Sequence, residues 1–138
     1  MRRKLDVGDY SFEITSDLLK GNDKYITFEK DIAFERKSSI DELALCFTKD
    51  RERFENEFKR KTDIDMECIL VIEDSSLNCI RKHNYRSKIN PKSLEASLLS
   101  WKHRYHYELL FCNKSEIGMY IYNLFYYYLK EQLVKGVI

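Results

Sequence analysis

Apolar residues along the chain follow two periods, and the period predicts the type of each element. The run 66–72 is almost continuously apolar, which is typical of a central strand buried on both faces of a sheet. Gly21-Asn22-Asp23 predicts a turn. Shorter β-prone runs predict further strands at 5–9, 10–14, 24–28, 32–37 and 107–112.

Apolar residues at every third or fourth position predict three helical segments, the first of which is interrupted at 48–50. They cover 40–47, 51–60, a segment that starts at Asn90-Pro91, and 115–134. Ser38 or Ser39 is a good N-cap for the first helix, and Ser115 is the expected cap of the last. A break is expected at 48–50. The order of strands, helix, strand, helix, strand and helix predicts an α/β domain with a central mixed β-sheet flanked by helices.

Composition limits the class of protein. At 138 residues the chain is long enough to bury a core, and we expect a single domain over residues 1–138. Hydrophobic residues make up 43% and charged residues 34%, a balance that argues against a disordered tail. The formal net charge is only +1, so nucleic-acid binding requires a local basic patch. No apolar run approaches the roughly twenty residues of a membrane span.

The four cysteines show no metal-binding spacing. Cys46, Cys68, Cys79 and Cys112 form no C-x-x-C pair and have no zinc spacing to a histidine. All except Cys79 fall in apolar runs, which favours buried reduced thiols. We therefore expect an intracellular, reducing location, either cytoplasmic or nucleoid-associated, or nuclear in a eukaryote.

The strand predicted at 32–37 carries the main candidate chemistry, Glu35-Arg36-Lys37. Residues i and i+2 of a strand point to the same face, so Glu35 and Lys37 project together and Arg36 points the other way. Asp9 follows a glycine at a predicted turn or bulge. Carboxylates on neighbouring strands can hold Mg²⁺ or Mn²⁺, and a lysine beside them can stabilise a hydroxide or the charge on a phosphate. Taken alone, a Glu-x-Lys pair is more often a solvated surface pair.

The wider pattern is Gly8-Asp9, then Glu35-Arg36-Lys37, then three residues and Asp41. It resembles the GDx(n)ERKx(3)D signature of the XPF-type nuclease domain, the structure-specific endonuclease branch of the PD-(D/E)xK superfamily. The flank 5–10 is similar to the family's L-x-V-G-D-Y, whereas Glu42 stands where the family usually has leucine. The resemblance implies a restriction-endonuclease-like fold.

The catalytic site expected from this pattern contains Asp9, Glu35, Arg36 and Lys37. Asp9 and Glu35 are the expected ligands of Mg²⁺ or Mn²⁺. Lys37 is expected to orient or stabilise the hydroxide that attacks the phosphate. Arg36 is expected to shape the site by pairing with a carboxylate or a phosphate.

Four further residues are expected to support this site: Asp41, Arg53, Glu57 and Glu73. Arg53 and Glu57 lie in a predicted helix similar to the family's R-L/F-x-x-Q/E helix, whose polar residues face the catalytic centre. Glu73 ends a strand similar to the family's L-I-E. The alternatives are a first-turn helix acid for Asp41, a solvated helix face for Arg53 and Glu57, and a strand-end turn residue for Glu73.

The segment 81–92 is the most basic part of the chain and contains no acid. We expect a loop between a strand and a helix that contacts DNA phosphates; the alternative is a mobile solvated loop. The candidate DNA-binding residues are Arg81, Lys82, Arg86, Lys88 and Lys92.

The last predicted helix is apolar most of the way round, which indicates deep burial or an interface. XPF-type domains commonly pair through such surfaces, so the resemblance implies a homodimer or heterodimer through this aromatic C-terminal helix. The family usually carries an earlier strand with an acidic D-x-R-E element, followed by a helix, and often a helix-hairpin-helix domain. The expected domain lacks that first strand and helix, and no helix-hairpin-helix domain is expected.

The predicted function is a Mg²⁺- or Mn²⁺-dependent DNA endonuclease. A preference for branched or flap DNA, in repair or recombination, is what the resemblance implies. The competing hypothesis is a non-catalytic pseudo-nuclease subunit that binds DNA and pairs with an active partner. The missing first strand favours that hypothesis, and the intact Glu35-Arg36-Lys37 argues against it. A third hypothesis is an RNA endonuclease or a restriction-type enzyme with the same core.

Overall fold

The computed structural model describes residue 5, residues 8–15 and residues 25–136. Its elements are, in order, β1 (Glu13–Thr15), β2 (Tyr25–Thr27), β3 (Ile32–Lys37), α1 (Ile40–Phe47), α2 (Arg51–Asp63), β4 (Glu67–Glu73), α3 (Leu77–Arg81), α4 (Pro91–Tyr105), β5 (Glu108–Cys112) and α5 (Ile117–Val134). Residues 6 and 7 of the strand predicted at 5–9 lie outside the described residues. Gly8 and Asp9 form a bend, in agreement with the turn or bulge predicted there, and Tyr10 makes only an isolated antiparallel bridge to Phe34. The turn predicted at 21–23 lies outside the described residues.

The strands β3, β4 and β5 form a parallel sheet with β4 in the centre. Lys37 pairs with Ile72, and Ile72 pairs with Phe111, so the carboxyl ends of the three strands lie at one edge. Parallel neighbours need long crossover connections, and these are made by α1 with α2 and by α3 with α4. β1 and β2 form a separate antiparallel pair. The predicted α/β fold with a sheet flanked by helices is confirmed.

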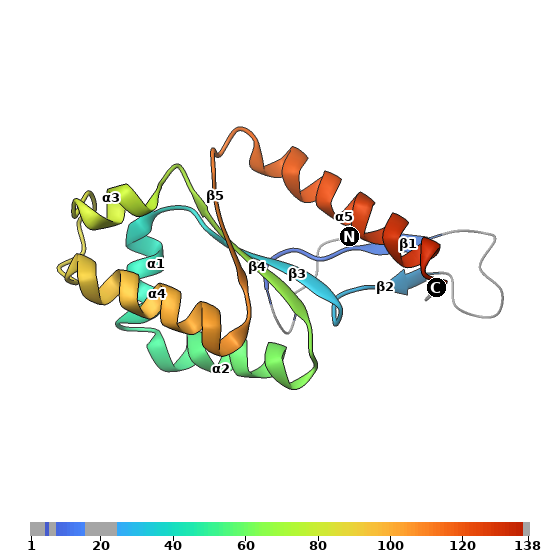
Figure 1. Ribbon diagram of the computed structural model, residues 1–138, viewed down its shortest axis with the longest axis horizontal. Helices are drawn as coiled ribbons and strands as arrows, with labels where there is room; N and C mark the ends of the chain where they lie inside the picture. The colour runs from blue at the N-terminus through green and yellow to red at the C-terminus, as the bar shows by residue number, and fades with distance from the viewer. Residues whose placement is uncertain (1–4, 6–7, 16–24, 137–138) are drawn as a thin grey trace.

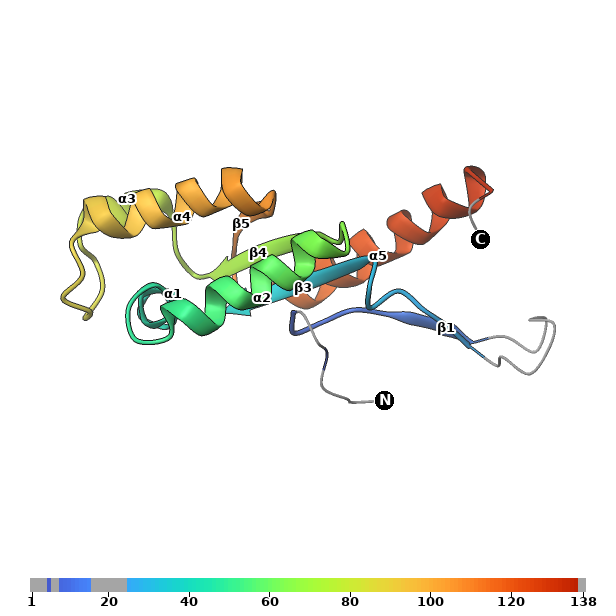
Figure 2. The ribbon, with the colours of Figure 1, turned by 90° about the horizontal axis from the view of Figure 1, so that it is seen from below.

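Each face of this sheet covers its own hydrophobic core. Leu70 and Ile72 of β4 pack with α1, α2 and α4 around the buried Trp101. Ile69 and Val71, which alternate with them, pack with α5 and the segments of β1 and β2. Figure 1 shows α2 and α4 on one side of the strands and α5 on the other. In Figure 2 α2 runs alongside β3, and this is where the candidate site lies.

Side-chain caps fix where α1 and α4 begin. Ser39 Oγ accepts the N–H of Glu42 at 3.1 Å and caps α1. Asn90 Oδ1 accepts the N–H of Lys92 at 2.8 Å and caps α4. The break predicted at 48–50 separates α1 from α2. The start of α1 is therefore fixed directly after the strand that carries Glu35-Arg36-Lys37.

Three details differ from the sequence prediction. Glu116, rather than Ser115, stands at the N-cap position of α5, and its side chain makes no capping bond. The short helix α3 was not predicted, and it contains Arg81. Cys112 is half-buried, whereas the other two cysteines predicted to be buried are buried. Within the described residues, no helix combines the length and apolar character needed to cross a membrane.

Candidate active site

Glu35 and Lys37 project from the same face of β3, as the two-residue period of a strand predicts. Lys37 Nζ donates to Glu35 Oε1 at 2.8 Å, and both side chains are buried. The ammonium group also lies 4.9 Å from the centroid of the Phe54 ring on α2, within the range of a cation–π contact. Two opposite charges are thus fixed side by side near the carboxyl end of β3.

The Gly8-Asp9 bend brings a second carboxylate to this part of β3. The N–H groups of Asp9 and Tyr10 both donate to the Phe34 carbonyl, at 2.7 and 3.1 Å. In return, the N–H of Arg36 donates to Asp9 Oδ2 at 2.7 Å. These bonds hold the Asp9 carboxylate beside the strand that carries Glu35.

Gly8 occupies a position that a side chain would not fit. Its φ is +79°, and a Cβ would lie 2.7 Å from the Ala33 Cβ and 3.1 Å from the Phe34 carbonyl oxygen. Its N–H donates to Glu57 Oε1 of α2 at 2.9 Å. The bend is therefore pressed against β3 and held in place by α2.

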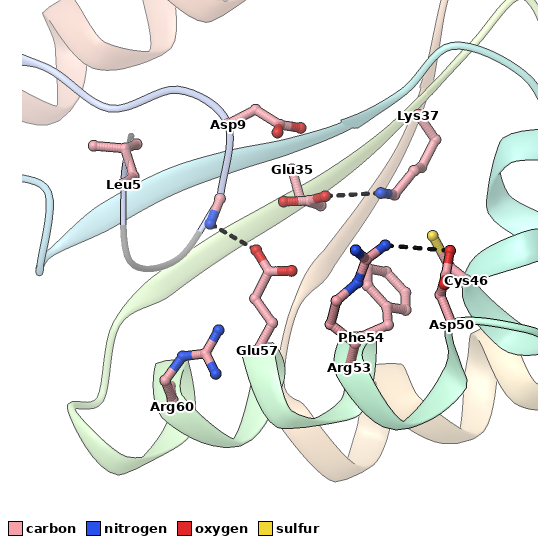
Figure 3. Close-up of a pocket in the computed structure, with 11 residues that line it drawn as sticks. Leu5, Asp9, Glu35, Lys37, Cys46, Asp50, Arg53, Phe54, Glu57 and Arg60 are labelled. Atoms are coloured by element: carbon pink, nitrogen blue, oxygen red, sulfur yellow. Dashed lines mark hydrogen bonds and ion pairs between the residues drawn. The ribbon is translucent and has the colours of Figure 1, made fainter. Parts of the chain in front are cut away.

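A cavity of about 380 Å³ opens between the bend, β3 and α2. Figure 3 shows Asp9, Glu35 and Lys37 along one side, with Glu57 and Arg53 projecting from α2 on the other. Five of the candidate site residues, together with Leu5 and Gly8 of the same sequence pattern, thus line one cavity. The full lining is Leu5, Gly8, Asp9, Glu35, Lys37, Cys46, Asp50, Arg53, Phe54, Glu57 and Arg60.

The cavity brings several carboxylates and Lys37 close together, and each charge shifts the pKa values of the others. Burial raises the pKa of Glu35, and the Glu57 and Asp9 carboxylates raise it further against the opposing effect of Lys37. Loss of surrounding water raises the pKa of Asp9, although the N–H of Arg36 and the charge of Lys37 act in the other direction. Burial lowers the pKa of Lys37, but the Glu35 carboxylate outweighs that effect and the pKa is raised overall.

The donor set fits a hard divalent cation. Asp9 and Glu35 supply carboxylate oxygens, the ligands that Mg²⁺ and Mn²⁺ prefer, and a cation would offset the repulsion between them. No group of three or more His, Cys, Asp or Glu side chains within residues 5, 8–15 and 25–136 is arranged to hold a metal ion by itself. Mg²⁺ usually keeps several waters and takes only one or two carboxylates from the protein, so two suffice.

Arg36 lies on the opposite face of β3 and pairs with a carboxylate. Its Nε and Nη2 donate to Glu73 Oε1 and Oε2 at 2.5 and 3.0 Å. Glu73 is buried at the end of β4 and does not line the cavity. The pair therefore braces β3 against β4 beside the cavity rather than within it.

Asp41 does not line the cavity either. Its Oδ1 accepts the N–H groups of Arg86 and Ser87, at 2.9 and 2.8 Å, and so contacts the basic segment. Within that segment, Arg81 ends α3 and forms a bidentate ion pair with Glu95 of α4, in which Nη2 donates to Oε1 at 2.7 Å and Nε donates to Oε2 at 3.3 Å. The remaining candidate DNA-binding side chains, all exposed, are Lys82, Arg86, Lys88 and Lys92.

Four lining residues were not singled out from the sequence: Cys46, Asp50, Phe54 and Arg60. Arg60 could have been found, because it lies three residues after Glu57 and seven after Arg53, on the same face of α2. Asp50 pairs with Arg53 at 3.2 Å, and sequence spacing of three on a helix is again the signal. Cys46 carries no such signal.

The family model that matches the chain is that of the ERCC4 domain, over residues 1–124. No curated protein and no solved structure matches the chain. ERCC4 domains are XPF-type nuclease domains, a family that acts on DNA in repair, and membership implies DNA binding. The resemblance based on the GDx(n)ERKx(3)D pattern is therefore confirmed, and the chain belongs to the ERCC4 domain family.

Proposed function

We propose that this chain is a Mg²⁺- or Mn²⁺-dependent endonuclease that hydrolyses phosphodiester bonds of DNA at the cavity between β3 and α2. The observation that carries the proposal is the convergence of Asp9, Glu35 and Lys37 on one open cavity. Carboxylates alone would repel a phosphate. A cation held by them, together with the Lys37 ammonium, turns the same cavity into a site for an anion.

Each of these three residues has a distinct role in the proposal. Asp9 and Glu35 hold the cation, and the bonds from the Arg36 N–H and from Lys37 orient the two carboxylates beforehand. A bound Mg²⁺ or Mn²⁺ supplies polarisation of the phosphate and a lower pKa for bound water. The Lys37 ammonium group donates a hydrogen bond to the attacking hydroxide or to a phosphate oxygen on which negative charge builds up.

The side chains of α2 position these groups and the substrate. Glu57 accepts the Gly8 N–H, so it holds the bend that carries Asp9 and acts as a positioning residue. Arg53 and Arg60 line the cavity and add positive charge for a phosphate next to the reacting one. The exposed lysines and arginine of the segment 82–92 contact phosphates further along the strand.

The proposed substrate is branched or flap DNA processed in repair or recombination, and ERCC4 family membership supports it. Pairing with a second chain through α5 is part of the proposal. Ile117 and Phe125 pack against the sheet, whereas Tyr122 and Met119 are each 67% exposed, and Tyr126 and Tyr127 are also exposed. Light scattering at high concentration should give twice the chain mass, and a monomer would contradict this part.

Cleavage of labelled flap, fork, four-way-junction, duplex and single-stranded DNA, with an RNA duplex alongside, tests the proposal. Wild type, Glu35→Gln and Lys37→Ala are compared in Mg²⁺, Mn²⁺ and EDTA. The expected result is metal-dependent cutting of DNA that EDTA abolishes and that both substitutions reduce by about a hundredfold or more. Urea unfolding of each variant shows whether the loss is one of chemistry or of folding.

Other outcomes of this experiment point to the other functions. Binding of the same DNAs without cutting, unchanged in both variants, would favour the non-catalytic pseudo-nuclease subunit. Cutting of RNA in preference to DNA would favour an RNA endonuclease with the same core.

A further inference from the structure

Asp41 ends the ERKx(3)D pattern, yet its carboxylate points to the loop between α3 and α4. Asp41 Oδ1 accepts two successive backbone N–H groups, those of Arg86 and Ser87, at 2.9 and 2.8 Å. These two bonds connect the loop 82–90 to the first turn of α1, and Figures 1 and 2 show the loop at the same end of the molecule as α1. A carboxylate that takes two backbone N–H groups fixes the path of that backbone.

The rest of the loop 82–90 is held by its own contacts. The Tyr85 hydroxyl donates to the Ile89 carbonyl at 2.8 Å, and the two side chains pack against the core under α4. The His83 ring stacks on Tyr85 with centroids 4.3 Å apart and hydrogen-bonds the Ser87 carbonyl at 2.8 Å. The backbone of the loop is held on one side by the packing of Tyr85 and Ile89 and on the other by Asp41. The positions from which its exposed side chains extend are therefore fixed.

The spacing along the chain limits how far this loop lies from the cavity. Asp41 follows Lys37 by four residues, which span at most about 14 Å even when fully extended. A DNA strand advances about 3.4 Å per nucleotide along the helix axis. Asp41 therefore ties the loop to a point within roughly four nucleotides of the cavity in which Lys37 lies.

We propose that Asp41 is a positioning residue, which holds the loop 82–90 so that Arg86 and Lys88 contact DNA phosphates a few nucleotides from the bond to be cut. The inference rests on the proposed function and adds to it a loop that binds the DNA backbone within roughly four nucleotides of the cavity. It gives Asp41, expected from the sequence to support the site, the role of a hydrogen-bond acceptor for the loop; the alternative is that Asp41 binds the metal ion. The two roles respond differently to loss of charge, because a hydrogen-bond acceptor needs only an oxygen, whereas a carboxylate that binds Mg²⁺ or Mn²⁺ binds it much more weakly once its negative charge is removed.

The comparison of Asp41→Asn with Asp41→Ala separates these roles. Asparagine keeps an oxygen that can accept both N–H groups, whereas alanine removes it. DNA affinity is measured by fluorescence anisotropy of a labelled flap DNA in EDTA, so that binding is read without cleavage. KM and kcat are then measured in Mn²⁺. Glu52→Ala, which removes an exposed acid of α2, serves as the control for charge, and urea unfolding of each variant checks folding.

Asp41→Ala should change DNA affinity in the direction opposite to that expected from the loss of one negative charge. Removal of an acid alone strengthens DNA binding, and Glu52→Ala should do so slightly. Asp41→Ala should instead weaken binding about tenfold and flatten the slope of log affinity against log salt by roughly two, since two phosphate contacts lose their fixed positions. Its KM should rise with kcat nearly unchanged, and Asp41→Asn should remain within about twofold of wild type.

A last comparison tests whether Asp41 acts through Arg86 and Lys88. In a chain that already carries Arg86→Ala and Lys88→Ala, Asp41→Ala should cause no further loss of affinity, because it acts through those two side chains. Wild-type affinity in Asp41→Ala would overturn the inference. So would an equal loss of kcat in Asp41→Asn and Asp41→Ala with normal binding, which is the signature of a metal ligand. Because binding is read in EDTA, a chain that binds but never cuts would contradict the nuclease proposal alone.

Discussion

Arg36 and Glu73 join the ends of β3 and β4 through two parallel hydrogen bonds, at 2.5 and 3.0 Å. The Glu73 side chain is 1% exposed and the Arg36 side chain 33%. The same arginine gives its backbone N–H to Asp9 on the cavity side of the strand. Arg36 therefore bonds to Glu73 through its partly buried side chain on one face of the sheet and to the Asp9 carboxylate of the cavity through its backbone N–H.

The first prediction concerns this ion pair. Glu73→Gln should lower the free energy of unfolding by about 2 kcal/mol, because it leaves a partly buried guanidinium without its charged partner. Urea unfolding measures the change. Glu95→Gln is the matched control, since it breaks the same kind of bidentate pair, with Arg81, at the surface, where we expect little effect. An equal loss of unfolding free energy in the two variants would show that burial of the Arg36–Glu73 pair does not increase its contribution to stability.

The second prediction concerns the bend that carries Asp9. Gly8→Ala should destabilise the protein by about 1–3 kcal/mol and reduce DNA cleavage, because a Cβ at φ +79° lies 2.7 Å from that of Ala33 and displaces the bend. Gly118→Ala is the control, since a Cβ there meets no atom within 4 Å, and a helical alanine should stabilise by about 0.5–1 kcal/mol. Urea unfolding and cleavage assays read both. A fully stable and active Gly8→Ala would contradict the assigned position of Asp9.

The third prediction concerns a buried lysine that caps a helix. Lys61 Nζ donates to the carbonyls of Tyr105 and His106, at 2.7 and 3.2 Å, at the C-terminus of α4. Lys61→Met should cost about 2 kcal/mol of unfolding free energy, because the Tyr105 carbonyl is left buried without a donor. Lys59→Met removes a lysine of the same helix that is more than half exposed and should change stability by less than about 0.5 kcal/mol. Thermal and urea unfolding measure both changes.

The fourth prediction concerns thiol reactivity. A hydrogen bond from Ser76 lowers the pKa of Cys79, whereas burial raises the pKa of Cys46 and raises that of Cys68 to about 12. The thiolate is the reactive form, so a thiol reagent should label Cys79 first, with a rate midpoint at a lower pH than that of an ordinary thiol. Mass spectrometry of the labelled peptides identifies the site, and Cys79→Ser should remove the fast phase. Fast labelling of Cys68 in the folded protein would contradict the core described for β4.

Local patterns made part of this structure predictable. The β-prone run at 32–37 has the bounds of β3, and its two-residue period placed Glu35 and Lys37 together. The similarity to the family's R-L/F-x-x-Q/E helix singled out Arg53 and Glu57, which lie four residues apart on α2 and both line the cavity. These contacts depend on positions a few residues apart, which is the range over which sequence period carries information.

Contacts between distant segments were not predictable in this way. Asp41 and its partner Arg86 are 45 residues apart, and Lys61 and Tyr105 are 44 residues apart, so only the packed fold brings them together. The bend at Gly8 and Asp9 likewise involves a distant contact. Gly8 has a φ of +79° and lies so close to Ala33 that a Cβ would not fit, and this contact is with a segment 25 residues away in the sequence.

The most direct test of the site is the single-turnover rate at which the full chain cuts labelled flap DNA in Mn²⁺, measured for wild type, Glu35→Gln and Glu95→Gln. Both substitutions remove one glutamate charge, but only Glu35 lies in the cavity beside Asp9 and Lys37. We expect Glu95→Gln to cut at the wild-type rate and Glu35→Gln to lose about a hundredfold or more while it remains folded. Cutting by folded Glu35→Gln at a rate close to wild type would contradict the proposal that this cavity is the catalytic site.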